Sequence, residues 1–398
     1  MIAPKFSLAR RAPLFVLAFS LLLCAASAQT EKVLYSFTGG TDGGIPLAGL
    51  IRDKSGNLYG TTNGGGAGFG TVFKLAPNGR ETVLYSFKGS PDGASPQAGV
   101  VRDAVGNLYG TTGYGGAFGY GIVYKISPTG TETILYTFTG GADGAWPFGG
   151  LVLDAQGKMY GGTNGGGASS GGCCGVLYKI SPTGTEKVLY TFTGNADGGS
   201  PQDRLIRDSH GNLYGTALFG GSGYSLAGFG TVFELTAAGA YKVLYTFTGG
   251  ADGGQSGAEL VQDKLGNLYG TTGLGGDLSC NGGAGCGVVF KLDTTGHETV
   301  LHPLAGGTDG MNPNLAGVVL DASGNLYGTT YQGGSSGDGT VFEVSASGIE
   351  SILLTFTGSD GASPQNSGGL ILDSKGNLYG TTSVGGAHSA GAVFKLTP

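Results

Sequence analysis

The sequence predicts an all-β protein, a seven-bladed β-propeller with four antiparallel strands in each blade. A phrase close to D-x-x-G-N-L-Y-G-T-T occurs seven times, at successive steps of 50, 51, 54, 55, 58 and 52 residues. Four short runs rich in Val, Ile, Leu, Tyr, Phe and Thr keep step with it, separated by Gly, Asp, Pro and Asn, which is the pattern of short strands between turns. Four strands in a period of about 50 residues match one propeller blade.

The first complete repeat shows the four expected strands, GLIRD at 49–53, NLYGTT at 57–62, TVFKL at 71–75 and VLYSF at 83–87. No segment between them has a helical period. Asp and Gly between the first two strands predict a tight turn, because Asp bonds nearby backbone N–H groups and Gly supplies a positive φ. Seven equivalent carboxylates are interpreted as structural, since a catalyst needs carboxylates in unequal environments. These turn residues are Asp53, Asp103, Asp154, Asp208, Asp263, Asp321 and Asp373.

The two ends of the repeat array complement each other. The array begins at 33–37 with a run that matches the fourth strand of a repeat, and the other three strands of that repeat do not precede it. It ends at 392–396 with a run that matches a third strand, and no fourth strand follows. We expect the N-terminal strand to pair beside the last third strand and close the ring. Closure would remove the exposed edges that an open sheet array carries.

The first 28 residues have the layout of a secretory signal peptide. Lys5, Arg10 and Arg11 precede the apolar run LFVLAFSLLL at 14–23, and an A-x-A cleavage site ends at Ala28. The run is shorter than the roughly 20 residues of a membrane span. We therefore expect a secreted chain, extracellular or periplasmic, with one propeller domain at 29–398 and no membrane span after cleavage. An uncleaved N-terminal anchor is the alternative.

The net charge of the chain limits the kinds of molecule that we expect it to bind. Without the three basic residues of the leader, the chain has 18 Lys and Arg against 27 Asp and Glu, a net charge of −9. Phosphate backbones require a basic face, so nucleic acid is not expected as a partner.

The 85 glycines separate the predicted strands instead of forming a disordered tract. We expect a monomer.

Binding is expected on the face that carries the long connections, because the other face has only tight turns. The connections between fourth and first strands each contain Asp-Gly, which predicts another turn. A ring of carboxylates binding calcium is the alternative, but calcium takes six to eight oxygens and each connection offers one acidic side chain. No cofactor is therefore expected. These aspartates are Asp42, Asp92, Asp143, Asp197, Asp252, Asp309 and Asp360.

The four cysteines after the leader lie in the second-to-third-strand connections of blades three and five. A secreted protein favours disulfides, and Cys280–Cys286 would close its own loop. Cys173 and Cys174 would then pair with each other, with strain, because adjacent Cα atoms lie about 3.8 Å apart. Bridges between the two blades remain open, whereas the adjacent pair is wrong for a zinc site.

Aromatic side chains on the long-connection face are candidates for stacking against sugars. They are Tyr114, Trp146, Phe219, Tyr224 and Tyr331. Packing over the neighbouring blade is the alternative, and we interpret Phe69, Tyr120 and Phe229, just before third strands, as structural. The expected partner is an extracellular glycan or another surface protein.

No linear catalytic signature is present. The sequence lacks G-x-S-x-G and H-E-x-x-H, and no helix follows its G-x-G strings, which excludes a nucleotide fingerprint. The favoured function is non-catalytic binding or adhesion. The first alternative is an extracellular polysaccharide lyase or hydrolase, because a propeller enzyme can scatter its residues around the axis without a linear signature. The second is a purely structural component of the envelope.

The phrases D-x-x-G-N-L-Y-G-T-T, G-T-V-F-K-L and V-L-Y-S-F together resemble the GloVer (Gloeo/Verruco) tandem repeat, over residues 31–398. The strand pattern is also similar to NHL-type propellers. The resemblance implies an exported bacterial repeat protein and carries over no catalytic residues. Blades three and six diverge most, with GKMYGGT and VLHPL in place of the common phrases.

Overall fold

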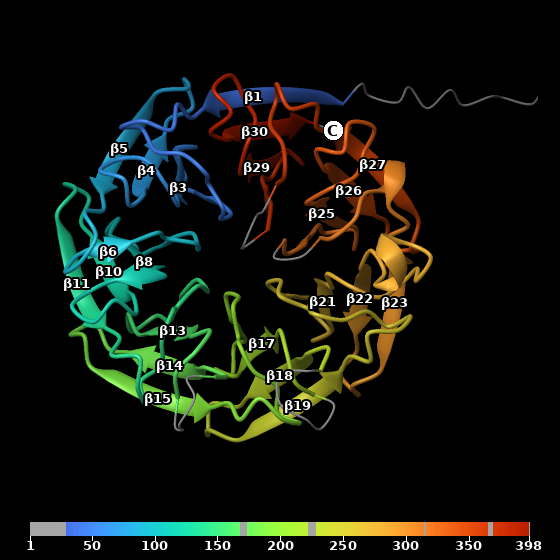
Figure 1. Ribbon diagram of the computed structural model, residues 1–398, viewed down its shortest axis with the longest axis horizontal. Coiled ribbons are helices and arrows are strands. Elements are labelled where there is room, and N and C mark those ends of the chain that lie inside the picture. The colour runs from blue at the N-terminus through green and yellow to red at the C-terminus, as the bar shows by residue number, and fades with distance from the viewer. Residues whose placement is uncertain (1–28, 168–172, 222–227, 314–315, 365–368, 398) are drawn as a thin grey trace, which may run out of the picture.

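The computed structural model describes residues 29–167, 173–221, 228–313, 316–364 and 369–397. Its strands form a closed ring of seven four-stranded antiparallel sheets (Figure 1), which confirms the predicted propeller. The predicted signal peptide and Tyr224 lie outside the described residues. Among the residues described, no helix is long and apolar enough to span a bilayer.

The blades follow one another around the ring in chain order. Blades one to three consist of β2 (Ile51–Arg52), β3 (Leu58–Thr62), β4 (Thr71–Leu75) and β5 (Glu81–Ser86); β7 (Val101–Arg102), β8 (Leu108–Thr112), β10 (Ile122–Ile126) and β11 (Glu132–Thr137); and β12 (Val152–Leu153), β13 (Met159–Gly162), β14 (Val176–Ile180) and β15 (Glu186–Thr191).

Blades four to seven consist of β16 (Ile206–Arg207), β17 (Leu213–Ala217), β18 (Thr231–Leu235) and β19 (Tyr241–Thr246); β20 (Val261–Gln262), β21 (Leu268–Thr271), β22 (Val288–Leu292) and β23 (Glu298–Pro303); β24 (Val319–Leu320), β25 (Leu326–Thr330), β26 (Thr340–Val344) and β27 (Glu350–Thr355); and β28 (Ile371–Leu372), β29 (Leu378–Thr382), β30 (Ala392–Thr397) and β1 (Thr30–Ser36). Two short 3-10 helices, η1 (Asn281–Gly283) and η2 (Gly307–Asp309), lie in connections.

The G-T-T of the second strand, present in five of the seven blades, explains why the phrase recurs. A Cβ on Gly60 would lie 2.8 Å from both Leu50 and Phe73, so glycine leaves room for the ring of the third strand. The Thr61 hydroxyl donates to the Ala98 carbonyl of the next blade, at 2.9 Å. The Thr62 hydroxyl donates to a carbonyl in the following connection. One threonine therefore joins neighbouring blades and the other fixes a loop.

The first strands are shorter than predicted, two residues instead of five. Only Ile51 and Arg52 pair with β3 in blade one. The residues before them contact the neighbouring blade instead, as the Ala98 carbonyl does in blade two. These segments therefore line the axis with few ladder bonds of their own.

The Asp of each first turn organises the rest of its phrase. Oδ1 of Asp53 accepts the backbone N–H groups of Ser55 and Asn57, both at 2.9 Å. Its Oδ2 accepts the Asn57 side-chain amide and the Tyr59 hydroxyl, at 2.8 and 3.0 Å. The spacing D-x-x-G-N-x-Y is thus the spacing of one hydrogen-bonded turn.

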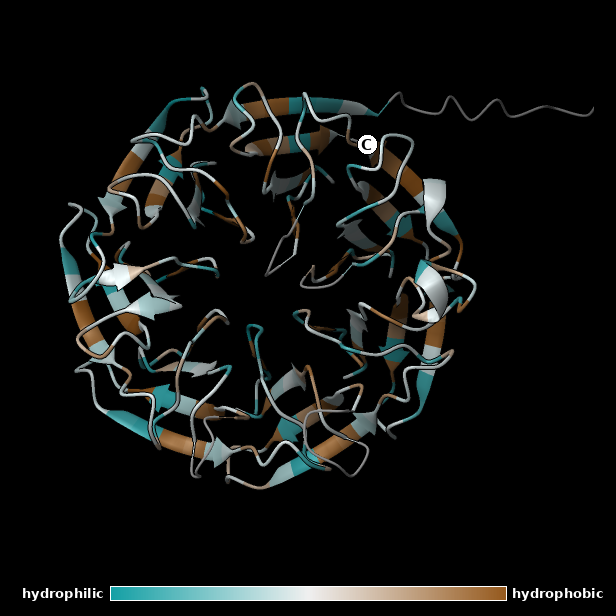
Figure 2. Ribbon diagram, in the orientation of Figure 1, coloured by the Kyte–Doolittle hydropathy of each residue, from teal (hydrophilic) through white to brown (hydrophobic). Residues whose placement is uncertain are grey.

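Ring closure uses the N-terminal strand, as predicted. β1 pairs antiparallel with β30, from Thr30 opposite Thr397 to Ser36 opposite Ala392. The fully buried ring of Phe37 packs edge-on against Phe73 of blade one, with centroids 5.1 Å apart. Figure 2 shows that the outer strands around the ring, β1 included, each have an apolar band along their middle.

The long connections are more ordered than the sequence indicates. In each blade the connection before the first strand pairs with the connection after the second strand. Blade two has a small ladder here, between β6 (Gly93–Ala94) and β9 (Tyr114–Gly115), and the other blades have single bridges such as Gly44–Gly64. One residue beside each pair has a φ of 52–58°, Trp146 among them. The long-connection face is therefore an ordered surface held by backbone pairing.

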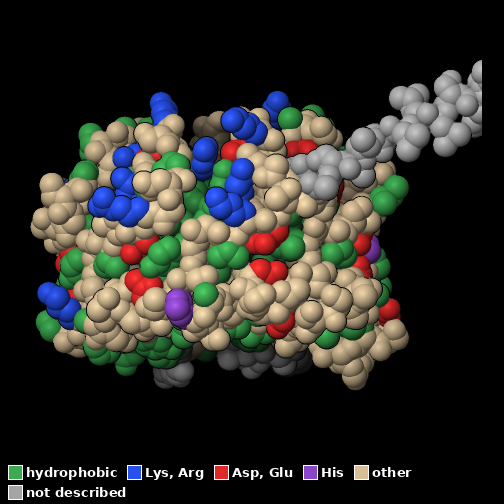
Figure 3. All heavy atoms as spheres, turned by 90° about the horizontal axis from the view of Figure 1, so that it is seen from above, with side chains coloured by type: hydrophobic (Ala, Val, Ile, Leu, Met, Phe, Trp, Pro, Cys, Tyr) green, Lys and Arg blue, Asp and Glu red, His purple; other side chains and the backbone are tan. Residues whose placement is uncertain are grey.

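At the rim, adjacent blades meet in a repeated polar junction. A tyrosine at the end of one outer strand donates to the aspartate of the next connection, at 2.9–3.0 Å, in five junctions. In six of the seven junctions, a glutamate opening the next outer strand faces this aspartate. Figure 3 shows acidic side chains spaced along the side wall. The tyrosine–aspartate pairs are Tyr35–Asp42, Tyr85–Asp92, Tyr136–Asp143, Tyr190–Asp197 and Tyr245–Asp252.

The junction glutamates make stability depend on pH. Burial, with a smaller contribution from Asp42, raises the pKa of Glu81 from 4.5 to about 7. The folded state therefore holds a proton that the unfolded state has released, and stability falls as pH rises from about 4.5 to 7. We expect Glu81→Gln to raise the midpoint of urea denaturation at pH 8 and to leave it unchanged near pH 4. An equal change at both pH values would contradict this assignment.

Candidate binding site in the central channel

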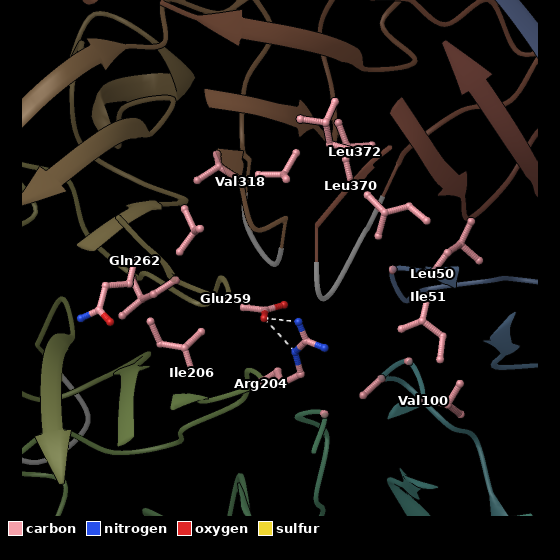
Figure 4. Close-up of a pocket in the computed structure, with 18 of the residues that line it drawn as sticks. Leu50, Ile51, Val100, Arg204, Ile206, Glu259, Gln262, Val318, Leu370 and Leu372 are labelled. Carbon is pink, nitrogen blue, oxygen red and sulfur yellow. Dashed lines mark hydrogen bonds and ion pairs between the residues drawn. The ribbon is translucent and has the colours of Figure 1, made fainter. Parts of the chain in front are cut away.

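The axis of the ring holds a cavity of about 550 Å³ to which all seven blades contribute. Figure 4 shows apolar side chains around it from the first strands and from the residues just before them, with the ion pair of Arg204 and Glu259 among them. Its walls are mostly aliphatic, and they include Leu50, Val100, Ile206, Val318 and Leu370. The charged pair, Arg204 and Glu259, lies just before two first strands, on the side of the long connections.

One position of the repeat supplies this pair. It is the residue two before the first strand, and five blades have glycine there while blades four and five have Arg204 and Glu259. The glycines are Gly49, Gly99, Gly150, Gly317 and Gly369. Neither residue was predicted from the sequence, because the repeat draws attention to positions that recur. Alignment of the seven repeats at this position would have revealed them.

The pair is tight. Arg204 Nε donates to Glu259 Oε1 at 2.7 Å, and Nη2 donates to the same oxygen. The Arg204 side chain is 34% exposed and that of Glu259 only 10%. Burial raises the pKa of Glu259, and the guanidinium opposes that rise. The site thus presents an accessible guanidinium held by a largely covered carboxylate.

Neighbouring glycines make room for the two side chains. A Cβ on Gly150 would lie 3.3 Å from the Arg204 side chain, and one on Gly317 would lie 3.1 Å from the Glu259 Cβ. Larger residues in blades three and six would press on the pair. The charged residues and the adjacent glycines therefore fit together as one site.

A third unrepeated polar residue, Asp203, directly precedes Arg204 in the chain. Asp203 is 4% exposed, where blades one, two, five and six have Ala48, Ala98, Ala258 and Ala316. The Thr216 hydroxyl lies 3.3 Å from its Oδ2, and Oδ1 has no hydrogen-bond partner in the described chain. Burial raises the pKa of Asp203 well above its usual value. A buried carboxyl of this kind costs stability, as expected at functional sites.

Four of the five aromatic residues predicted to bind sugars are described by the structure, and these four lie around the long-connection face. Tyr114 is 44% exposed, with its ring 5.8 Å from Phe148. The half-buried Trp146 packs beside Tyr120, at 5.8 Å, and Phe219 and Tyr331 are half-buried. Among the four described, no ring contact links any two. Tyr224 lies outside the described residues.

The cysteines pair within their own loops. Cys280 is joined to Cys286, with Cα atoms 5.7 Å apart, and Cys173 to Cys174, at 3.7 Å. The Cys174 and Cys286 carbonyls accept the N–H of Ser200 and Asn312 in the next blade. The Tyr120 carbonyl accepts from Trp146 in the same way. Each disulfide thus fixes a residue that contacts the following blade.

Comparison with known proteins places the chain in a repeat family. The Gloeobacter/Verrucomicrobia repeat matches residues 22–174, 171–283 and 278–398. The chain belongs to this family. No curated protein sequence matched it. The family is defined by its repeat, so it explains the blades and assigns no role to the residues of the channel.

Solved structures share the fold. Puromycin hydrolase aligns with a TM-score of 0.52 at 15% identity, over 86% of this chain and 50% of the hydrolase. A mutant of the hydrolase gives 0.53 at 14% identity, with the same coverage. A candidate 6-phosphogluconolactonase from Bacteroides uniformis gives 0.48 at 16% identity, over 77% of this chain and 83% of that one. At these identities the likeness concerns architecture alone.

Proposed function

We propose that this chain is an exported, non-catalytic binding protein that holds a polar group of an extracellular glycan, such as a terminal sugar, in the mouth of the central channel. The observation that carries the proposal is the placement of Arg204 and Glu259 where five other blades have glycine. A scaffold that only needs to close its ring has no use for a charged pair on its axis.

The chemistry of the mouth suits a neutral polar ligand. A guanidinium donates and a carboxylate accepts, so a paired Arg204 and Glu259 can engage two adjacent hydroxyl groups. The aliphatic wall suits the C–H face of a sugar ring. A cavity of about 550 Å³ is within the range of small-ligand sites. The pair itself carries no net charge, which suits a neutral ligand; Arg207 also lines the cavity, and its guanidinium lies over the Tyr160 ring.

The test is a glycan array followed by calorimetry on the chain from residue 29. We expect the double substitution Arg204→Gly and Glu259→Gly to weaken binding at least about tenfold, which is about 1.4 kcal/mol. Its thermal midpoint should stay close to the parent because glycine is the common residue there. Trp146→Ala serves as a second probe and should weaken retention of longer glycans without changing the melt. Undiminished binding by the double variant would place the site elsewhere.

An extracellular polysaccharide lyase or hydrolase is the second candidate. The observation that favours it is the presence of two buried carboxyls, Asp203 and Glu259, near each other. Burial, and to a smaller degree Glu259, raises the pKa of Asp203. Carboxyls in unequal environments are the pattern of general acid and base pairs. This candidate predicts release of product from polysaccharides, and loss of turnover with retained binding in Asp203→Asn. The binding proposal predicts no product from either protein.

A further inference from the structure

We propose that the rim junction between blades five and six binds a divalent transition ion of the zinc type through His302, Asp309 and Glu350. One potential ligand atom from each of the three residues lies within 4.8 Å of the others. His302 lies in β23, Asp309 ends η2, and Glu350 opens β27. The three residues are 7 and 41 positions apart in sequence, and the ring brings them together.

Comparison with the other rim junctions shows how the junction between blades five and six differs. Five of them have a tyrosine where this one has His302, and the phenol donates to aspartate at 2.9–3.0 Å. His302 Nε2 lies 3.3 and 3.4 Å from the two Asp309 oxygens, longer than a good N–H···O bond. The imidazole is therefore a poor substitute for the phenol as a hydrogen-bond donor. Unlike the phenol, it can offer a nitrogen lone pair to a metal.

The spacing fits a tetrahedral ion. Zinc binds His nitrogen and carboxylate oxygen at about 2.0–2.2 Å, which separates neighbouring ligand atoms by about 3.3 Å. His302 and Asp309 already have this separation. The Glu350 oxygen would approach by at most about 1.5 Å, within the reach of a side-chain rotation. The Ala305 N–H holds the second Asp309 oxygen at 2.6 Å, which fixes the carboxylate in place.

Charge and access agree with this geometry. Oε1 of Glu350 is buried and without a hydrogen-bond partner in the described chain, as is the same oxygen of the other five junction glutamates, so the imidazole is what distinguishes this junction. The Glu350 carboxyl and that of Asp309 offer oxygens within 4.8 Å of each other, so a divalent ion between them would offset two like charges. The His302 and Asp309 side chains are 21% and 17% exposed, which leaves an entry path and a fourth position for water.

The experiment is calorimetric titration of Zn²⁺ into the tag-free chain from residue 29, with thermal melts alongside. We expect one ion per chain, an increase in the melting temperature with zinc, and a loss of affinity of at least about tenfold in His302→Tyr. His302→Tyr restores the common junction, so its melt without zinc should match the parent. Tyr245→His, beside Asp252 and Glu298, should raise the stoichiometry from one ion to two.

Three results would overturn the proposal. The first is no zinc binding by the parent chain. The second is an affinity for zinc in His302→Tyr equal to that of the parent, or loss of zinc binding in His210→Asn instead. The exposed His210 is the competing candidate because it lies 3.7 Å from Asp208 and could bind zinc on its own. The third is binding of Ca²⁺ alone, since an ion of that class does not need the imidazole.

Discussion

A chain that lacks residues 30–37 is expected to lose the cooperative thermal transition of the ring. The deletion removes β1, whose residues pair with β30 from Thr30 to Ser36, and it leaves β30 as an exposed edge. It also removes Phe37, which is fully buried against Phe73. Truncation of such a phenylalanine alone costs about 3–5 kcal/mol, against total stabilities of about 5–15 kcal/mol. Circular dichroism melts would measure the loss.

A circular permutation provides the control for this deletion. Thr30 lies opposite Thr397, so β1 can follow β30 directly through a Ser-Pro-Thr-Gly turn like that at 127–130. A chain that starts at Thr38 and carries residues 30–37 after such a turn should melt close to the parent. If the deleted chain melts normally, or if the permuted chain fails as the deleted one does, closure by β1 is not what stabilises the ring.

Arg204→Ala is expected to lower the free energy of unfolding by about 2–4 kcal/mol, because it leaves the covered carboxylate of Glu259 without its partner. The figure lies toward the low end for buried pairs since Arg204 is one-third exposed. Without the guanidinium the pKa of Glu259 in the folded state rises further. The unfolded chain then releases its proton at lower pH, so the loss should grow from pH 5 to pH 8.

The matched control removes both charges. Arg204→Gly combined with Glu259→Gly gives blades four and five the residue found in the other five, and should unfold within about 1 kcal/mol of the parent. Urea denaturation at pH 5 and pH 8 compares the three proteins. A double variant as unstable as the single one would show that the two side chains stabilise the ring separately, through packing.

The repeat made the architecture predictable. Each phrase encodes a local unit, such as the turn in which Asp53 bonds Ser55, Asn57 and Tyr59, and local units can be inferred from spacing. Seven such units and complementary ends predicted both the number of blades and the closing strand. The paired connections were not predicted, because their bridges join segments about 20 residues apart that have no strand pattern, as in Gly44–Gly64.

The candidate sites depend on exceptions to the repeat. Arg204 and Glu259 are 55 residues apart, and His302 and Glu350 are 48 apart, in phrases that otherwise agree with their neighbours. The sequence alone therefore determined the blade, its turns and the count of seven, because those follow from contacts within one repeat. Only the tertiary structure decided which unrepeated side chains meet, because a closed ring brings equivalent positions of adjacent blades together at the axis and at the rim.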